Sequence, residues 1–585
     1  GLKKFEEAER LLKKFNPQDN HQKFSYLGIK SALYSETNIE KYKNNLIKLY
    51  SHISNYSKSV TKNRGEPSVE NYNSDIEDFI YRYNSLKKSD SEKVSDYFLN
   101  QTGIKIETAL IELSEISRSS KLNKRVKNIV NRSKNDKLNN EKRILQDLII
   151  SYEKIPLISE NNLDKEKNIK KLISIKREIN NQQNKILSKI DIQKFSNFGQ
   201  EISLKNIQKE LKSNQLILSY YLTNRQGLYI YCITNNNFEI KKIDITNDKL
   251  KNLIKQIKAS ISVENIRNNK FDLSKSNEIY NILINPIKKN LINKNELIII
   301  PHKSLTSLPF EILVENKSSE STSWLIKNYS TSYYPSIYSF YNLNKIKLKN
   351  KKDSFIGFGN PKFSSSKNKK AINYNNIMLR GIANPEEIRN MISLPETEKE
   401  LKILSKLFKK ENSKIYVGKK FSEDKLKSLN LSNYRYIAFA THAIIANQIN
   451  NISEPGLILT PPKVATEAND GILTVSEIEK LNLQSDVIIL SACNTASDDG
   501  TPNGEGLSGL ASAFFHAGTK SILVTHWDVE TNAAINLTTG TFKYLKNSDN
   551  LSKALQKAKI EMLSNPDTSH PFYWAPFILI GNLNL

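Results

Sequence analysis

Apolar residues recur at helical spacing through the first third of the chain. The stretches 106–117, 144–152 and 169–190 each place their large apolar side chains three or four positions apart, with polar residues between them. Glycine and proline are sparse in this part of the chain. The pattern predicts an α-helical region over residues 1–200. A helical bundle and a degenerate array of helix pairs both fit, because no clear 34-residue repeat is visible.

The pattern changes near residue 200 to short runs of β-branched and aromatic residues. Residues 216–221, 228–233 and 238–240 form three such runs, separated by polar, asparagine-containing turns. This arrangement predicts an antiparallel meander. Cys232 lies inside the second run, so we expect a buried structural thiol there.

From about residue 280, short apolar strands alternate with helices. We predict strands at 297–301, 355–359, 415–417, 436–440, 457–460, 487–490, 522–524 and 577–580. Near-continuous apolar strands between helices favour a mainly parallel sheet that is covered on both faces, so the expected class is α/β. The span 362–393 has no clear period, and we interpret it as a long exposed loop.

These patterns divide the chain into two parts. We expect the α-helical region at 1–200 and one domain at 201–585, in which 201–280 hold the meander and a helix and 281–585 hold the α/β core. A chain of 585 residues is long enough for several domains, each with a core of its own.

The net charge of +26 raises the question of nucleic-acid binding. Residues 421–585 hold 11 Lys and Arg against 16 Asp and Glu, while the first 420 residues hold 76 against 45. The basic excess is spread along helix-like segments, without the stripe of arginine and aromatic residues that nucleic-acid proteins present. A helical region that grips phosphate is therefore the least favoured hypothesis.

Three features bear on the compartment in which the protein works. The sequence contains no unbroken run of about 18 apolar residues, so we expect no membrane span. Two distant cysteines, Cys232 and Cys493, do not make a disulfide scaffold, which favours a reducing compartment and a cytoplasmic protein. The chain begins with Gly1 and shows no signal-peptide pattern, so we expect a processed or truncated start.

Candidate chemistry follows two of the predicted strands. Thr-His-Ala, with His442 and Ala443, comes after strand 436–440, and Ser-Ala-Cys, with Cys493, comes after strand 487–490. If these strands are parallel neighbours, their carboxyl ends bring His442 and Cys493 side by side. An imidazole there can favour the thiolate and later protonate a leaving amine. Backbone N–H groups at Ala443 and Cys493 can hold an oxyanion.

Other interpretations of these residues stay open on spacing alone. A histidine at a strand end is often only a polar residue, and a single cysteine is often buried packing. A metal site is disfavoured, because Cys493 and the histidines show no close paired-ligand spacing. Walker-type and dinucleotide glycine fingerprints are absent.

The whole segment from about residue 200 to 585 resembles the CHAT domain family of caspase-like cysteine peptidases, kin to caspases and separases. The resemblance includes Phe-Ala-Thr-His-Ala and Leu-Ser-Ala-Cys-Asn-Thr, which contain the two candidate residues. The matching blocks, in chain order, are 299–313, 333–336, 357–361, 394–401, 439–443, 470–474, 490–495, 504–510, 525–530 and 572–581. One departure is Ala443, because many members have glycine after the histidine.

The resemblance implies a caspase-like α/β sandwich and peptide-bond hydrolysis without metal or organic cofactor. His442 would be the catalytic histidine and Cys493 the nucleophile. The family often joins this domain to helical repeats of the tetratricopeptide (TPR) type, which implies that residues 1–200 bind a protein activator or substrate. A catalytically inactive scaffold that binds protein partners is the alternative function.

The block 525–530 resembles the segment that shapes the specificity pocket in separases. Asp528 or Glu530 would there receive a basic residue of the substrate through a charge-assisted pair. The competing interpretation is that an acid in this block caps the helix that begins near residue 531.

Overall fold

The computed structural model describes residues 2–17, 20–60, 73–117, 174–175, 178, 203–223, 227–261, 271–317, 322–346, 353–363, 385–444, 454–466, 469–491, 509–527, 529–548 and 550–582. Cys493, Asp528 and the predicted helix at 144–152 lie outside the described residues, as does almost all of 169–190. No helix within the described ranges is long and apolar enough to cross a membrane.

The described part of the first 200 residues is helical, as its apolar spacing predicts. The helices are α1 (Leu2–Lys14), α2 (Asn20–Thr37), α3 (Ile39–Val60), α4 (Asn73–Asn84), α5 (Lys88–Thr102) and α6 (Ile106–Ser117). Helix α5 ends at Gly103, whose φ of 70° is the left-handed conformation that glycine adopts at little cost. The apolar faces of α3, α4 and α6 meet in one core around Leu46, Phe79 and Leu110.

One sheet of eleven strands runs through the rest of the chain. Its strands, in spatial order, are β3 (Phe238–Ile243), β2 (Leu228–Ile233), β1 (Gln215–Leu222), β4 (Glu296–Ile300), β7 (Ser330–Tyr333), β16 (Phe577–Gly581), β15 (Ser521–Thr525), β14 (Val487–Ser491), β10 (Tyr436–Ala440), β8 (Phe355–Gly359) and β9 (Ser413–Val417). Strands β1, β2 and β3 form the predicted antiparallel meander. Strand β1 also pairs in parallel with β4, so the meander extends the main sheet. Most other neighbours are parallel, and the expected α/β class is confirmed.

Three details differ from the predicted strands. Residues 457–460 do not join the main sheet: β12 (Gly456–Ile458) lies between β11 (Ala443–Ile444) and β13 (Ile472–Thr474) in a small antiparallel sheet. Strand β16 runs antiparallel to β15. Strand β7 was not predicted, because Ser-Thr-Ser-Tyr lacks an apolar run although all four residues are buried.

Helices cover both faces of the sheet, which makes the layered sandwich that the pattern predicts. Tyr436 of β10 packs against Phe542 of α21 (Thr531–Leu545), whereas Phe439 packs against Phe514 of α20 (Gly509–Ala517). Residues an odd number of positions apart on a strand face opposite sides. The other helices are α10 (Leu204–Lys209), α11 (Asn247–Ala259), α13 (Leu273–Leu283), α14 (Leu325–Asn328), α15 (Ile337–Asn344), α16 (Pro385–Arg389), α17 (Pro395–Lys406), α18 (Glu423–Lys427), α19 (Val475–Lys480), α22 (Leu551–Leu563) and α23 (Pro571–Trp574).

The span 362–393 is not simply an exposed loop, and that expectation was wrong for its described end. Residues 385–389 form α16, and Ile388 on this helix is fully buried. The sequence gives no helical period there because the helix has only five residues. Residues 364–384 lie outside the described part of the chain.

The helical region and the sheet share a core. Tyr221, Tyr229 and Tyr231 of the meander pack into the apolar core of α3, α4 and α6. The Glu115 carboxylate of α6 accepts a hydrogen bond from the backbone N–H of Tyr338 in α15, at 3.1 Å. The boundary predicted at residue 200 is therefore a boundary in the sequence pattern and not a break in packing.

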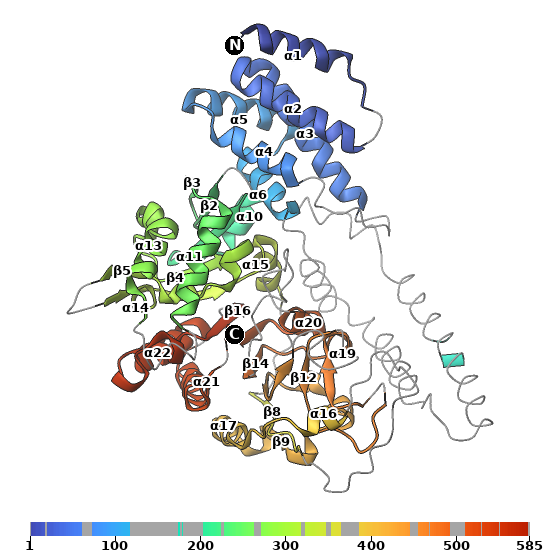
Figure 1. Ribbon diagram of the computed structural model, residues 1–585, viewed down its shortest axis with the longest axis vertical. Coiled ribbons are helices and arrows are strands. Elements are labelled where there is room, and N and C mark those ends of the chain that lie inside the picture. The colour runs from blue at the N-terminus through green and yellow to red at the C-terminus, as the bar shows by residue number, and fades with distance from the viewer. Residues whose placement is uncertain are drawn as a thin grey trace.

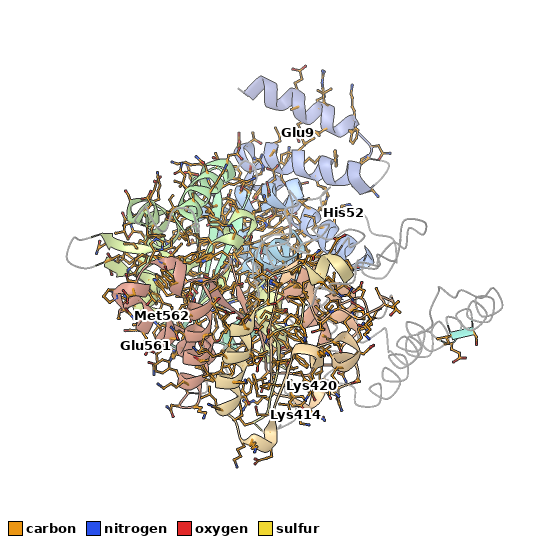
Figure 2. The ribbon with its side chains drawn as sticks, turned by 60° about the horizontal axis from the view of Figure 1, so that its bottom comes forward. Glu9, His52, Lys414, Lys420, Glu561 and Met562 are labelled. Atoms are coloured by element: carbon orange, nitrogen blue, oxygen red, sulfur yellow. The ribbon has the colours of Figure 1, made fainter. Side chains whose placement is uncertain are left out.

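The long axis of the molecule is vertical in Figure 1. In Figure 1 the helices α1–α6 form one end, while β8, β9 and α17 lie at the other. Figure 2 marks the same two ends by Glu9 and His52 of the helical region, and by Lys414 and Lys420 in and after β9.

Candidate active site

The candidate dyad depends on how two strands pair. Strands β10 and β14 are parallel neighbours, and Ala440 pairs with Ser491 at their carboxyl ends. His442 follows Ala440 by two positions, and Cys493 follows Ser491 by two positions in the sequence. The pairing on which the dyad prediction depends is therefore present in the sheet, while Cys493 itself lies outside the described residues.

His442 is held by a backbone carbonyl. Its Nε2 lies 2.8 Å from the carbonyl oxygen of Ile392. A carbonyl oxygen can only accept, so Nε2 carries the proton and Nδ1 of the neutral ring is the basic nitrogen. The Phe363 ring stacks on the imidazole at an interplanar angle of 27°, with ring centroids 6.1 Å apart. The described contacts thus fix both the tautomer and the plane of the ring.

The backbone around His442 is fixed by the small antiparallel sheet. The His442 carbonyl accepts a hydrogen bond from Ile458 N–H at 2.9 Å. The Thr441 hydroxyl donates to the Ile458 carbonyl at 2.6 Å. Because Ile458 of β12 binds both Thr441 and His442, the direction of the chain after β10 is fixed at the histidine.

A small apolar cluster includes Met391, the residue before Ile392. Its buried members are Ile388, Ile444, Ile458 and Ile472, with Phe363 and Met391 packed against them. The Arg389 guanidinium also donates to the Pro462 carbonyl, which ties α16 to the loop after β12. The Ile392 side chain is 80% exposed, so its backbone and not its side chain contributes to the site. Sequence patterns missed this partner because a main-chain carbonyl carries no residue signature.

Ala443 lies in β11, opposite Leu457. Its φ is not positive, since the non-glycine residues with positive φ in the described chain are Asn293, Lys303, Asn360 and Gln484. Alanine therefore fits the position where many members of the resembled family have glycine. The oxyanion role of the Ala443 and Cys493 N–H groups stays a prediction.

Glu530 caps a helix. Its carboxylate accepts hydrogen bonds from Asn532 N–H at 3.0 Å and Ala533 N–H at 2.8 Å, so Glu530 is the N-cap of α21. The capping interpretation of this acid is confirmed. Asp528 lies outside the described residues, and the pocket role of both acids remains a prediction.

A buried carboxylic acid lies at the end of β14. Glu400 of α17 accepts hydrogen bonds from the Ser491 hydroxyl at 3.1 Å and the Thr538 hydroxyl at 2.8 Å. Burial raises the pKa of Glu400 to about 7, although both hydroxyl contacts act to lower it. Glu400 lies in the block 394–401, where no local pattern indicates a role for it.

The remaining candidate cysteine is structural. Cys232 is 1% exposed, forms no disulfide and lies in β2 as predicted. Burial raises the pKa of the Cys232 thiol to about 12. This thiol is therefore protonated and unreactive at neutral pH.

Comparison with known proteins places these residues in context. The family model described as the CHAT domain matches residues 273–582, just over half of the chain. Tetratricopeptide repeat protein 28 from Homo sapiens is 24% identical over 345 residues, which cover 52% of this chain and 13% of that protein. The Mus musculus protein of the same name matches equally. The chain thus spans only about an eighth of the length of these curated relatives.

Solved structures also align with the chain. The separase–securin complex of Saccharomyces cerevisiae aligns with 98% of this chain and 51% of its own, with 12% identity and a TM-score of 0.41. The Arg-specific cysteine proteinase gingipain R aligns with 58% of this chain and 75% of its own, with 8% identity and a TM-score of 0.30.

Proposed function

The chain belongs to the CHAT domain family, and on this premise we propose that it is a cysteine endopeptidase of the caspase and separase type. Cys493 and His442 are the proposed dyad. The observation that carries the proposal is the support of His442, which stands at the end of β10 beside β14 with its Nε2 proton donated to the Ile392 carbonyl. A nucleophile is activated by a neighbouring base, and a third group commonly orients that base.

The proposed reaction uses the basic Nδ1 of His442. This nitrogen takes the proton of the Cys493 thiol, and the thiolate attacks the carbonyl carbon of the scissile peptide bond. The N–H groups of Ala443 and Cys493 stabilise the tetrahedral oxyanion. The imidazolium then protonates the departing amine as the C–N bond breaks, and water hydrolyses the thioester to release the acid and the thiol.

The proposed specificity is for a basic residue before the scissile bond. Glu530 already accepts two amide hydrogen bonds from α21. Asp528 is for this reason the stronger candidate to pair with a substrate cation. A peptide set that differs only at this position tests the idea, and an Asp528→Asn variant should lose the preference for Arg and Lys.

We propose that the helical region receives a protein activator or substrate. Three apolar side chains are about half exposed or more: Leu11 on α1, Phe15 just after α1, and Ile29 on α2. The core that this region shares with β1 and β2 gives a bound partner a path to the sheet. A free thiol at Cys232 fits the cytoplasm that we propose as the compartment.

Covalent labelling tests the proposal. A peptide library that carries an electrophilic ketone should form an adduct on Cys493, and mass spectrometry should find Cys232 unmodified. His442→Ala should slow the adduct strongly, and Cys493→Ala should abolish it. Partner binding without any adduct or cleavage would favour the alternative, an inactive scaffold.

A further inference from the structure

Glu400 connects three elements next to the candidate site. Its side chain is 2% exposed and belongs to α17. One carboxylate oxygen accepts from Ser491, the last residue of β14, and the other accepts from Thr538 in α21. The carboxylate therefore ties the end of the strand that leads to Cys493 to two helices.

Helix α17 is itself fixed against β8, the strand that pairs with β10. Leu401 packs so closely on β8 that a Cβ on Gly357 or Gly359 would come within 2.8 Å of its methyl carbons. The Thr397 hydroxyl accepts a hydrogen bond from Asn360 N–H at 2.8 Å. Such contacts leave the helix little freedom to slide over the sheet.

The same helix starts three positions after Ile392, whose carbonyl holds His442. The segment just before α17 thus contains the carbonyl that binds His442. The second turn of α17 contains Glu400, which binds Ser491 at the end of β14. The two strand ends are paired in the sheet, and a single helix adds a contact near each of them.

The chemistry of Glu400 is unusual for a purely structural contact. Burial of a carboxyl group is costly unless opposite charge or several donors compensate it. The pKa of Glu400 is shifted by burial and by two neutral hydroxyls, and no cation contributes to the shift. A leucine or methionine would fill the same space at lower cost, so the carboxylate has a geometric reason to be there.

We propose that Glu400 is a positioning residue, which holds the carboxyl end of β14 through Ser491 so that the thiol meets the imidazole fixed by the start of α17. The inference rests on the proposed peptidase function and adds a residue to it. Glutamine has nearly the same shape, but its NH₂ group can only donate. In Glu400→Gln the hydroxyl that faces the NH₂ group must therefore accept a hydrogen bond instead of donating one, which changes its contact with residue 400.

The test uses the full chain and needs no substrate. Iodoacetamide alkylation of Cys493 is followed by mass spectrometry at several pH values, with buried Cys232 as the internal reference. The variants are Glu400→Gln, Ser491→Ala, the double variant and His442→Ala. Glu396→Gln is the matched control, because this glutamate lies exposed on the first turn of the same helix.

We expect Cys493 of the wild type to be alkylated near pH 6.5 faster than an ordinary thiol. His442→Ala should abolish this difference in rate. Glu400→Gln and Ser491→Ala should each slow alkylation roughly 10-fold, because small displacements of reacting groups have large kinetic effects. The double variant should be no slower than either single one, since both remove one link. Glu396→Gln should match wild type, and all variants should melt cooperatively.

Three results would overturn the inference, and they are distinguishable. Wild-type rates in Glu400→Gln, combined with slow alkylation in His442→Ala, would reject the positioning role and leave the dyad intact. Equal rates in wild type and His442→Ala would contradict the proposed function and, with it, the positioning role. Additive losses in the double variant would show that Glu400 acts by another route than Ser491.

Discussion

The two halves of the sheet treat their polar groups differently. His302 lies at the carboxyl end of β4, beside the helical region. Its Nδ1 accepts a hydrogen bond from Leu222 N–H at 3.0 Å, and its ring stacks on Tyr221. At the carboxyl end of β10, His442 donates from Nε2 to the Ile392 carbonyl, and no described residue pairs with its Nδ1. The fold occupies Nδ1 of His302, whereas Nδ1 of His442 has no described partner and is available for the proposed reaction.

Two buried carboxyl groups repeat this contrast. Glu311, beside β7, accepts from Lys559 at 2.9 Å, from Tyr333 at 2.6 Å and from Thr331 at 2.7 Å. Burial opposes its ionisation, but Lys559 and the hydroxyls hold the pKa of Glu311 below its usual value. Glu400 has neutral partners only, and its pKa is raised. Groups that are buried without a counter-charge occur often at functional sites.

The largest expected effect is the difference in activity between variants of the two histidines. His442→Ala should lower peptide hydrolysis about 10²- to 10⁴-fold, because it removes the general acid–base group. His302→Ala should keep the activity within a few fold, and it should lower the free energy of unfolding by about 1–3 kcal/mol because Leu222 N–H loses its acceptor. Initial rates and urea denaturation of both variants make the measurement. Equal losses of activity would break the distinction between the two strand ends.

The next effect concerns the charge-paired carboxyl. Lys559→Met should destabilise the fold by about 3–5 kcal/mol, because it leaves Glu311 buried without its cation. Lys553→Met is the matched control: Lys553 lies 2.7 Å from Glu296 but is 38% exposed, and Glu296 keeps amide donors from Gln215 and Asn550. We expect the control to change the unfolding free energy by less than about 1 kcal/mol. Similar losses in the two variants would contradict the assignment.

A smaller effect is a pH dependence of opposite sign for the two carboxyls. The raised pKa of Glu400 means that its contribution to stability is present below its unfolded pKa and is lost as pH rises through about 7. Glu400→Gln should therefore gain stability relative to wild type between pH 5 and pH 8, by about 1–3 kcal/mol. For Glu311, whose pKa is lowered, stability is instead lost as pH falls through its folded pKa.

Thermal melts across this pH range check the sign for Glu400. Glu396→Gln should follow wild type at every pH, since that glutamate is exposed. A difference between Glu400→Gln and wild type that does not change with pH would show that Glu400 keeps one protonation state throughout.

The smallest effect concerns the cluster under Ile392. Ile388→Ala removes a fully buried side chain from the small cluster that lies apart from the main core. We expect a loss of peptide hydrolysis of about 3- to 10-fold and faster hydrogen exchange in residues 385–392, with little change in global unfolding. Met391→Ala, at the partly buried edge of the same cluster, should have a weaker effect. Unchanged exchange in Ile388→Ala would mean that the cluster does not place the Ile392 carbonyl.

The sequence predicts the sheet well where strands are apolar and poorly where they are not. Strands β10 and β14 have continuous apolar runs, so their place and the strand ends after them were predictable. Strand β7 was missed because its buried hydroxyls are satisfied by long-range partners such as Glu311, which no local pattern reveals. The Ile392 carbonyl was missed for a related reason, since only tertiary contacts bring a backbone group to His442.

Glu400 shows an intermediate case. It precedes Leu401 and shares the buried face of α17 with Leu404, so an acid adjoining an apolar stripe was visible in the sequence. Its partners Ser491 and Thr538 lie 91 and 138 positions away. The local pattern could reveal an unusual acid, but only the fold shows that it holds the end of β14.

An unbiased peptide-library digest tests the proposed activity most directly. Intact protein and the Cys493→Ala variant are incubated with the same library, with any protein activator present in both, and the new termini are sequenced. We predict a restricted set of cleavage sites in the wild-type sample and none in the variant. Identical cleavage in the two samples would contradict the assignment of Cys493 and His442 as a catalytic pair. Cleavage by His442→Ala at the wild-type rate would contradict it as well.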